Sequence, residues 1–266
     1  MTDTEILKWG TDNIVWAGNA HTNQDSRKEQ KPLMIVDHMS MGSKSSCISW
    51  FTSPGNKNSS AHFLVGLDGS VYQFVSIYKN AWGNGLTAGM ANATSELVHE
   101  MGQNISVNRY SVSIEHEGGI EDYGDLSTEQ LNSSILLHKF IIAFVKKNFN
   151  HTIEPTRKFI VGHYEINKRD KMNCPGSAFP FTKIIAALGG KTENLPFDDI
   201  YEHWAKDLIL EAVSLGLVSG RSGSKNFFPD DRASRAESIT LIVALYHKIK
   251  EEFEEVLKEI SNSTFK

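Results

Sequence analysis

Short apolar runs alternate along the chain with longer segments in which apolar residues recur at helical spacing. Residues 32–39 and 159–161 are apolar and partly β-branched, which predicts two buried strands. Two further apolar runs, at 60–66 and 71–75, flank the turn-forming pair Asp68-Gly69 and predict a β-hairpin. Several strands separated by helical segments are typical of an α/β fold.

Residues 110–119 alternate between apolar and polar positions, which is the period of a half-buried strand. One face carries Val112, Ile114 and His116, and the other carries Ser111, Ser113, Glu115 and Glu117. A strand that turns serines and two carboxylates to one side predicts a polar cleft along that side.

Helical spacing accounts for much of the remaining first part of the chain. Ser127 to Gln130 has the pattern of a capping box, and the apolar spacing that follows predicts a long helix ending near Phe149. A closing helix is expected at 181–188, whereas residues 1–30 are weakly patterned and are expected to form an irregular lead-in. These elements predict one α/β domain over residues 31–188.

A change in composition marks a second unit. Residues 189–195 read as a polar linker, and residues 196–266 contain two helical patterns, at about 203–216 and 234–260. The turn-rich segment 220–231 separates these two patterns. We therefore expect a small, all-α C-terminal module with a helical extension.

Composition narrows the classes of function. The chain has 266 residues, 40% of them hydrophobic and 22% charged, with a net charge of −5, so it lacks the basic footprint of a nucleic-acid-binding protein. No apolar run is long enough to span a membrane, and no secretory signal pattern opens the sequence. We expect synthesis in the cytoplasm, with a separate exit route for any work outside the cell.

The two cysteines, Cys47 and Cys174, cannot form a disulfide framework. Cys47 lies in an apolar segment and is expected to pack as a small hydrophobic residue. Cys174 precedes Pro-Gly in a loop, and His163 and His38 each stand where a predicted strand ends. Two imidazoles and one thiolate that converge would form a catalytic zinc site, with a fourth position for water. The alternative for each histidine is a surface or core role.

Six motifs then follow one another in an order that resembles a known family. They are Ile35–His38, Ser60–Gly69, Ala81–Gly85, Ser111–Gly118, Gly162–Ile166 and Asn173–Phe179. In this order they resemble the zinc-dependent N-acetylmuramoyl-L-alanine amidases shared by phage endolysins, muropeptide-recycling amidases and peptidoglycan recognition proteins. The resemblance covers about residues 30 to 185.

The resemblance implies a mixed β-sheet flanked by helices, with one zinc ion held by His38, His163 and Cys174. It also implies hydrolysis of the amide that joins N-acetylmuramic acid to L-alanine in bacterial peptidoglycan. Family members without a ligand at the position of Cys174 bind peptidoglycan without cleaving it. The cysteine therefore favours an enzyme over the alternative, a non-catalytic peptidoglycan-binding protein.

Glu115 lies where the family has its catalytic glutamate and is the expected general base and acid. Some members use a tyrosine from the hairpin instead, but the corresponding position here is Ala61. The family commonly places a lysine two residues before the last metal ligand, where this chain has Met172. We therefore expect Lys171 to stabilise the oxyanion, with the neighbouring basic pair Lys168-Arg169 as competitors.

Two aromatic side chains are candidate substrate contacts. Trp82, in a glycine-rich loop, is expected to stack on sugar or peptide, with a core role as the alternative. His62, on the predicted hairpin, is expected to line the cleft, although a buried structural histidine is an equal alternative.

The segment 196–247 resembles one S-layer homology repeat, a module that holds proteins on secondary cell-wall polysaccharide. Arg235 corresponds to the arginine of that family's Arg-Ala-Glu motif and suits an anionic carboxylate. Trp204 is expected to support that site, with packing as the alternative. Such repeats usually occur in threes, and one is present here. We therefore expect either weak wall binding or self-association of chains that supplies the missing neighbours.

An amidase joined to a wall-binding module predicts a phage or prophage endolysin that reaches the wall through a separate, holin-type exit. A mother-cell lytic amidase of a spore former is the alternative within the same chemistry. A cytosolic recycling enzyme suits the sequence less well, because a wall anchor would serve it no purpose.

Overall fold

The computed structural model describes residues 1–87, 89–102, 105–119, 124–190, 196–197, 200, 203, 205–220 and 226–264. The chain divides into two compact units, Met1–Glu193 and Asn194–Lys266. The two units are described separately below.

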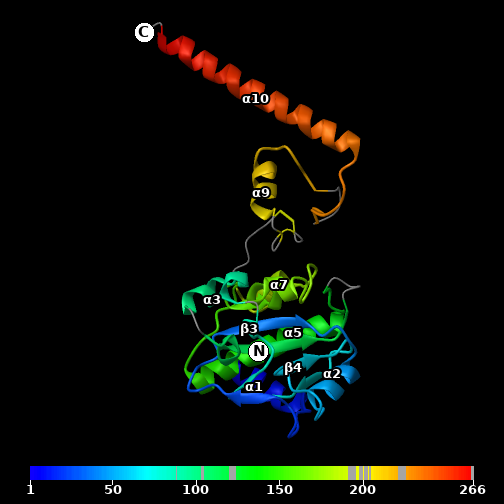
Figure 1. Ribbon diagram of the computed structural model, residues 1–266. Coiled ribbons are helices and arrows are strands. Elements are labelled where there is room, and N and C mark those ends of the chain that lie inside the picture. Colours follow the sequence, from blue (N-terminus) through cyan, green and yellow to red (C-terminus); the bar gives the residue numbers. More distant parts are fainter. Residues whose placement is uncertain are drawn as a thin grey trace. The chain divides into compact units, whose positions relative to one another are not determined.

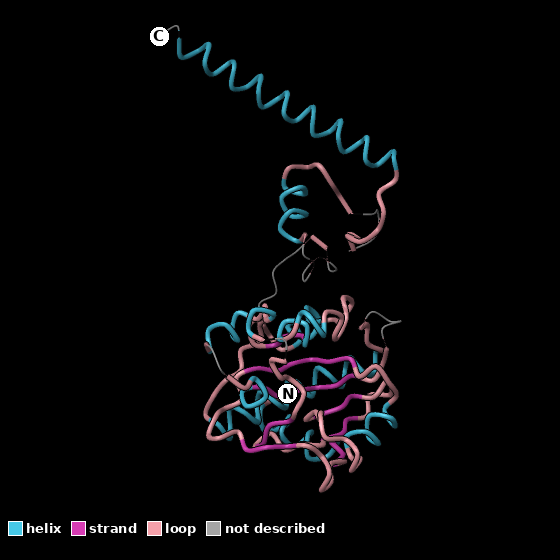
Figure 2. The backbone as a smooth tube through the Cα atoms, in the orientation of Figure 1, coloured by secondary structure: helices cyan, strands magenta, loops and turns pink. Residues whose placement is uncertain are grey.

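Unit 1 is built on a six-stranded sheet (Figure 1). In spatial order its strands are β1 (Ile14–Trp16), β5 (Val71–Gln73), β4 (Phe63–Val65), β7 (Ser111–His116), β3 (Met34–Met39) and β8 (Ile160–Gly162). The hairpin pair β4 and β5 is antiparallel, and every other neighbouring pair is parallel. A second, two-stranded antiparallel sheet joins β2 (Gln24–Ser26) to β6 (Lys79–Ala81). The mixed sheet predicted from the sequence is confirmed, and Figure 2 shows its strands gathered in one layer.

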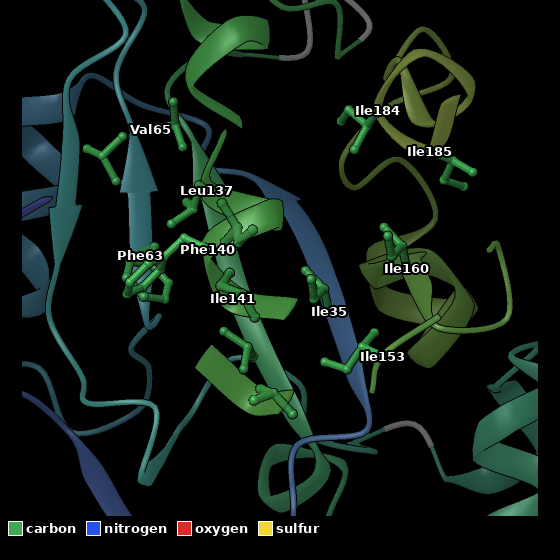
Figure 3. Close-up of a cluster of buried hydrophobic side chains, with 14 of the residues drawn as sticks. Ile35, Phe63, Val65, Leu137, Phe140, Ile141, Ile153, Ile160, Ile184 and Ile185 are labelled. Atoms are coloured by element: carbon green, nitrogen blue, oxygen red, sulfur yellow. The ribbon is translucent and has the colours of Figure 1, made fainter. Parts of the chain in front are cut away.

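One face of the sheet is covered by α1 (Asp3–Asn13), α5 (Thr128–Phe149) and α8 (Phe181–Ala187). Ser127 caps α5, because its hydroxyl accepts a hydrogen bond from the Gln130 N–H at 3.1 Å. Leu137, Phe140 and Ile141 share one side of α5 and pack on this face of the sheet, as Figure 3 shows. This layer forms the largest hydrophobic core of the described chain.

The opposite face is covered by shorter elements, namely α2 (Lys44–Phe51), the 3₁₀ turn η1 (Met90–Asn92), α3 (Glu96–Met101), α4 (Val107–Tyr110) and α6 (His163–Ile166). The short helix α7 (Lys168–Lys171) follows α6 and buries none of its residues. Met34 and Val36 of β3 pack here, whereas Ile35 faces α5. By the same alternation, His38 lies on the side of the short elements. On β7, Val112 and Ile114 join the α5 core, so Glu115 takes the same side as His38.

The expectation of an irregular segment at residues 1–30 is wrong. This segment contains α1, β1 and β2, and β1 extends the main sheet beside β5. Gly10 of α1 lies against α5 so closely that a Cβ there would come within 2.3 Å of the Phe140 ring. The strands have three residues each, too short to show a period, and α1 buries only Ile6 and Gly10, so no apolar stripe marks it in the sequence.

Unit 2 contains α9 (Lys206–Ser214) and α10 (Arg235–Thr264), drawn in yellow and in orange to red in Figure 1. Phe197, Ile200 and Ile209 form a small buried cluster, with Phe227 packed against it. The expectation of an all-α module is confirmed by these two helices. Among the described residues of both units, no helix is long and apolar enough to cross a membrane.

Candidate metal centre and active site

Three side chains converge at the C-terminal ends of two adjacent strands. His38 stands near the end of β3, and His163 begins α6 immediately after β8, the strand paired with β3. Cys174 follows α7 in a loop whose Cys174–Pro175 peptide bond is cis. Their ligand atoms lie within 4.8 Å of one another, and Cys174 Sγ is 3.9 Å from His38 Nδ1. The structure thus brings together the three residues that the sequence analysis named.

Gly162 allows the cysteine loop to approach the strand end. A Cβ at this position would lie 2.8 Å from Pro175 Cδ and 2.6 Å from the Tyr164 ring, so a larger residue would push the loop away. The Tyr164 N–H donates a hydrogen bond to the Cys174 carbonyl at 2.9 Å, which ties the loop to the start of α6. The position of the thiol therefore depends on a close backbone approach.

The electrostatics of these three groups suit a divalent cation. Burial lowers the pKa of His38 to about 4 and that of His163 to about 2, so both imidazoles are neutral and can offer a lone pair at neutral pH. Burial raises the pKa of the Cys174 thiol to about 12, so a cation is needed to displace its proton. Two nitrogens and one sulfur that share a zinc ion are separated by roughly 3.3–3.7 Å. The three atoms, which lie within 4.8 Å of one another, would have to draw somewhat closer together around the ion.

Glu115 and Glu117 lie on the same strand face but in different environments. Both oxygens of the Glu117 carboxylate accept backbone hydrogen bonds, from Lys44 N–H at 2.7 Å and Leu67 N–H at 2.8 Å. Glu115 Oε2, in contrast, is buried and has no hydrogen-bond partner among the described residues. Glu115 also pairs in register with the ligand His38. Its carboxyl group is thus the one left available for chemistry.

Burial also sets the proton affinity of Glu115. It raises the pKa of this carboxyl group to about 7, and the positive charge of Lys171 opposes that rise. A general base that must later act as an acid works best when its pKa lies near the operating pH. The position and the pKa of Glu115 therefore both suit such a role.

A cavity of about 690 Å³ opens beside these groups and includes all three candidate ligands and Glu115 in its wall. Lys171 also lines the cavity, whereas neither residue of the competing pair Lys168-Arg169 does. Arg169 instead pairs with Asp170 at 2.8 Å. Of the three cations that the sequence offered for oxyanion stabilisation, Lys171 is the one that the structure brings to the site.

The two candidate substrate contacts, Trp82 and His62, lie in different environments. Trp82 lines the cavity, and its indole N–H donates to Asp25 Oδ2 at 2.8 Å, which fixes the ring. His62 is 1% exposed and does not line the cavity. Its Nε2 lies 3.0 Å from Arg27 Nη2, and its Nδ1 lies 3.1 Å from Ser113 Oγ. Direct substrate contact by His62 is therefore contradicted, because residue alternation indicated its face and could not indicate its depth.

Two further residues of the site, one in the cavity wall and one behind a candidate ligand, were not singled out from the sequence. Trp50 is 48% exposed and lines the cavity, with its indole N–H donated to Ser59 Oγ at 3.0 Å. It lies in the last turn of α2, in the apolar segment from which only Cys47 was considered. Asn84 is buried, and its Oδ1 lies 2.7 Å from His38 Nε2. Its position in a glycine-rich loop gave no signal of contact with a candidate ligand.

In unit 2, Arg235 is exposed at the first turn of α10. Ser234 and Glu237 form a reciprocal cap there: Ser234 N–H donates to Glu237 Oε2 at 2.7 Å, and Glu237 N–H donates to Ser234 Oγ at 3.2 Å. Trp204 lies outside the described residues, so its predicted supporting role has no structural description. The guanidinium of Arg235 is thus presented to solvent from a capped helix start.

Comparison with known proteins identifies both units. Residues 28–177 match the family model described as N-acetylmuramoyl-L-alanine amidase, and residues 196–237 match the S-layer homology domain. The N-acetylmuramoyl-L-alanine amidase A of Achromobacter lyticus is 26% identical over 190 residues, which cover 66% of this chain and 93% of that protein.

Solved structures are similar over a comparable share of the chain. The N-acetylmuramoyl-L-alanine amidase LysC from Clostridium intestinale URNW is 19% identical, with a TM-score of 0.43, and the match covers 67% of this chain and 99% of that one. A selenomethionine derivative of AmpD is 21% identical, with a TM-score of 0.48, and the match covers 66% and 94%.

Proposed function

The chain belongs to the N-acetylmuramoyl-L-alanine amidase family, whose model spans more than half of it, and acts on peptidoglycan; we propose that it does so with one zinc ion held by His38, His163 and Cys174. The observation that supports this proposal most strongly is the convergence of two neutral imidazoles and a thiol at a site that also holds a carboxylate oxygen, Glu115 Oε2, which is buried and has no partner among the described residues. Three protein ligands leave a position open, as in catalytic rather than structural zinc sites.

The scissile bond joins the lactyl carbonyl of N-acetylmuramic acid to the nitrogen of L-alanine. A zinc ion held at this site supplies Lewis acidity and lowers the pKa of water to roughly 7. Glu115 takes a proton from the attacking water as its oxygen bonds to the carbonyl carbon. Glu115 then gives that proton to the leaving nitrogen as the C–N bond breaks. The products are the lactyl carboxylic acid and the amine of L-alanine, and proton transfer from the acid to the amine leaves a carboxylate and an ammonium group at neutral pH.

Lys171 and Trp82 act on the substrate around this bond. The ammonium group of Lys171 stabilises the negative charge that develops on the carbonyl oxygen, because a cation placed there interacts more strongly with the transition state than with the ground state. Trp82 offers its ring, held by Asp25, as a surface for sugar or peptide. Both side chains line the same cavity as Glu115.

The proposal is tested by mass spectrometry of purified peptidoglycan digested with the protein, with and without a chelator. We expect free stem peptides that begin with L-alanine, together with uncut glycan strands, and we expect the free peptides to disappear on chelation and return with added zinc. Intact wall that nevertheless sediments with the protein would support the competing function, a non-catalytic peptidoglycan-binding protein. Release of peptides that persists in the chelator would contradict the metal assignment.

We further propose that unit 2 holds the enzyme on secondary cell-wall polysaccharide and that the protein is a lytic enzyme of the endolysin kind. The S-layer homology match and the exposed guanidinium of Arg235 support wall retention. An enzyme that only recycled soluble muropeptides would gain nothing from such a module. In an endolysin, a separate protein that permeabilises the membrane opens the way to the wall. Lysis that requires such a protein would support this role, and lysis confined to sporulation would indicate a mother-cell amidase.

Self-association would supply the neighbours that a single repeat lacks. Ile239, Ile242, Tyr246, Ile249 and Phe253 are each more than half exposed along α10, at alternating spacings of three and four residues. This heptad spacing is the pattern by which one helix packs against another with the same period, and a second copy of the chain provides such a helix. Sedimentation velocity should show an oligomer that Ile242→Ser with Ile249→Ser dissociates and that Leu241→Ser, off the seam, does not. A wild-type monomer at micromolar concentration would contradict the proposal.

A further inference from the structure

We infer that Asn84 is the positioning residue of the metal centre: it holds His38 with Nδ1 toward the ligand cluster. The inference rests on the proposed function, since it assumes that His38, His163 and Cys174 hold the metal. Asn84 lies in the loop after β6 and is 1% exposed, so its amide is removed from solvent. A buried amide of this kind must satisfy its hydrogen-bonding groups within the protein.

Asn84 makes three hydrogen bonds, and each goes to a different element. Its Oδ1 lies 2.7 Å from His38 Nε2. Its Nδ2 donates to Ser111 Oγ at 2.7 Å, and its backbone N–H donates to Asn108 Oδ1 at 2.6 Å. The loop is therefore connected to β3, to the start of β7 and to α4, and the imidazole of His38 is fixed by a group that is itself fixed at two other points.

The polarity of this chain of hydrogen bonds sets the tautomer of His38. Ser111 Oγ donates to the Val107 carbonyl at 2.8 Å, and a carbonyl can only accept. The Ser111 oxygen is then the acceptor for the Asn84 amide nitrogen, which leaves Asn84 Oδ1 as the acceptor toward His38. His38 Nε2 must carry the proton, so Nδ1 has its lone pair free, and Nδ1 is the atom 3.9 Å from Cys174 Sγ.

Arg27 secures the segment that anchors Asn84. Its guanidinium is 3% exposed and donates to the carbonyls of Arg109 at 2.7 Å, Ser111 at 3.0 Å and Ile77 at 2.7 Å. The bonds to Arg109 and Ser111 hold the turn from α4 into β7, where both Asn108 and Ser111 lie. The support of His38 thus extends outward from the ligand, through Asn84, to a buried cation.

Groups that orient a metal-bound histidine typically change metal affinity by about 10- to 100-fold when they are removed. Asn84→Leu keeps the number and branching of the side-chain heavy atoms but removes the acceptor, and its bulkier apolar side chain leaves little room for a water that could replace the amide. We expect zinc affinity to fall by about 10- to 100-fold in this variant. Asn84→Asp keeps an acceptor for His38 Nε2 and should remain within a few-fold of the wild type.

The experiment measures zinc affinity of the full chain by competition with a chromophoric chelator. Asn56→Leu is the matched control, because Asn56 is an equally buried amide whose Nδ2 donates to the carbonyls of Trp50 and Ser59, away from the ligands. Loss of affinity in Asn84→Leu, with wild-type affinity in Asn56→Leu and Asn84→Asp, supports the inference. Unchanged affinity in a folded Asn84→Leu overturns it while leaving the metal assignment intact. A wild type that binds no zinc contradicts the proposed function instead.

A second measurement needs no variant. Long-range ¹H–¹⁵N spectra of the metal-free wild type report which imidazole nitrogen of each histidine carries the proton. We expect His38 to be protonated at Nε2 alone. A His38 protonated at Nδ1, or one that exchanges between both tautomers, would overturn the inference even if Asn84→Leu failed to fold.

Discussion

The two units of this protein differ in how far they bury their polar and apolar side chains. In unit 1, a buried arginine, Arg27, has its charge surrounded by backbone carbonyls, and every helix of the α5 face contributes to one large core. In unit 2, the buried cluster is small, and α10 exposes a row of large apolar side chains. The contrast indicates that unit 1 holds its chemistry in a rigid frame of its own, whereas unit 2 presents surface for something else to cover.

The largest expected effect comes from removing the proposed general base, Glu115, from unit 1. Glu115→Gln should lower hydrolysis of a soluble muramoyl peptide by about 10²- to 10⁴-fold, because it removes the proton acceptor and leaves the carbonyl contacts in place. Wall sedimentation should stay at the wild-type level, since unit 2 is untouched. The assay is peptide release followed by chromatography.

Glu117→Gln is the matched control, because Glu117 lies two residues after Glu115 on the same face of the strand. Both of its carboxylate oxygens accept backbone hydrogen bonds, so this change should reduce stability and leave turnover within about threefold of the wild type. Equal losses of turnover in the two variants would show that Glu115 supports the structure of β7 and does not transfer the proton.

The next effect concerns the stability of the frame. Arg27→Met should lower the free energy of unfolding of unit 1 by about 2–4 kcal/mol, because it leaves several buried carbonyls without a donor. Arg232→Met, an exposed arginine of unit 2, should change stability by less than about 0.5 kcal/mol. Urea denaturation measures the free energy of unfolding of both variants. An unchanged value in Arg27→Met would show that this buried cation contributes little to the stability of unit 1.

The buried carboxyl group should also make stability depend on pH. In the metal-free protein the pKa of Glu115 is raised by burial from 4.5 to about 7, so folding favours its protonated form. Stability is therefore lost as the pH rises through this interval, by an amount on the order of 1–3 kcal/mol. Glu115→Gln lacks this penalty, so it should be the more stable protein at pH 8 and should match the wild type near pH 4.5. Denaturation in a chelator at both values tests this, and an equal difference at the two would contradict the assigned pKa.

The smallest expected effect lies in unit 2. Arg235→Ala should weaken retention on purified wall by roughly 3- to 10-fold, the loss expected when one charge-assisted contact to an anionic polymer disappears. Cleavage of a soluble muramoyl peptide should be unchanged. A sedimentation assay against wall, with the soluble assay beside it, separates the two. A fall in both would mean that Arg235 supports the fold.

The sequence predicted those parts of the site that follow from local pattern. Strand ends placed His38 and His163, and period-two alternation placed Glu115 on the correct side of β7. The same alternation could not show that His62 is buried and absent from the cavity wall. Alternation also gave no signal for Asn84 or Arg27, because their roles depend on contacts that are distant in sequence. Asn84 contacts His38, 46 positions earlier in the chain, and Arg27 contacts Arg109, 82 positions later. Local periodicity carries no information about such pairings. The strands of the first 30 residues have three residues each, which is too short for a periodic pattern to be recognised.

The most direct test of the contrast between the units is to separate them. Residues 1–190 should hydrolyse a soluble muramoyl peptide with a kcat/KM within about threefold of the full chain, because all groups proposed for the chemistry lie in unit 1. The same fragment should lose retention on wall. A fragment that folds, as judged by its circular dichroism and cooperative unfolding, yet fails to cleave the soluble substrate would contradict the account, because unit 2 would then have to contribute to the active site.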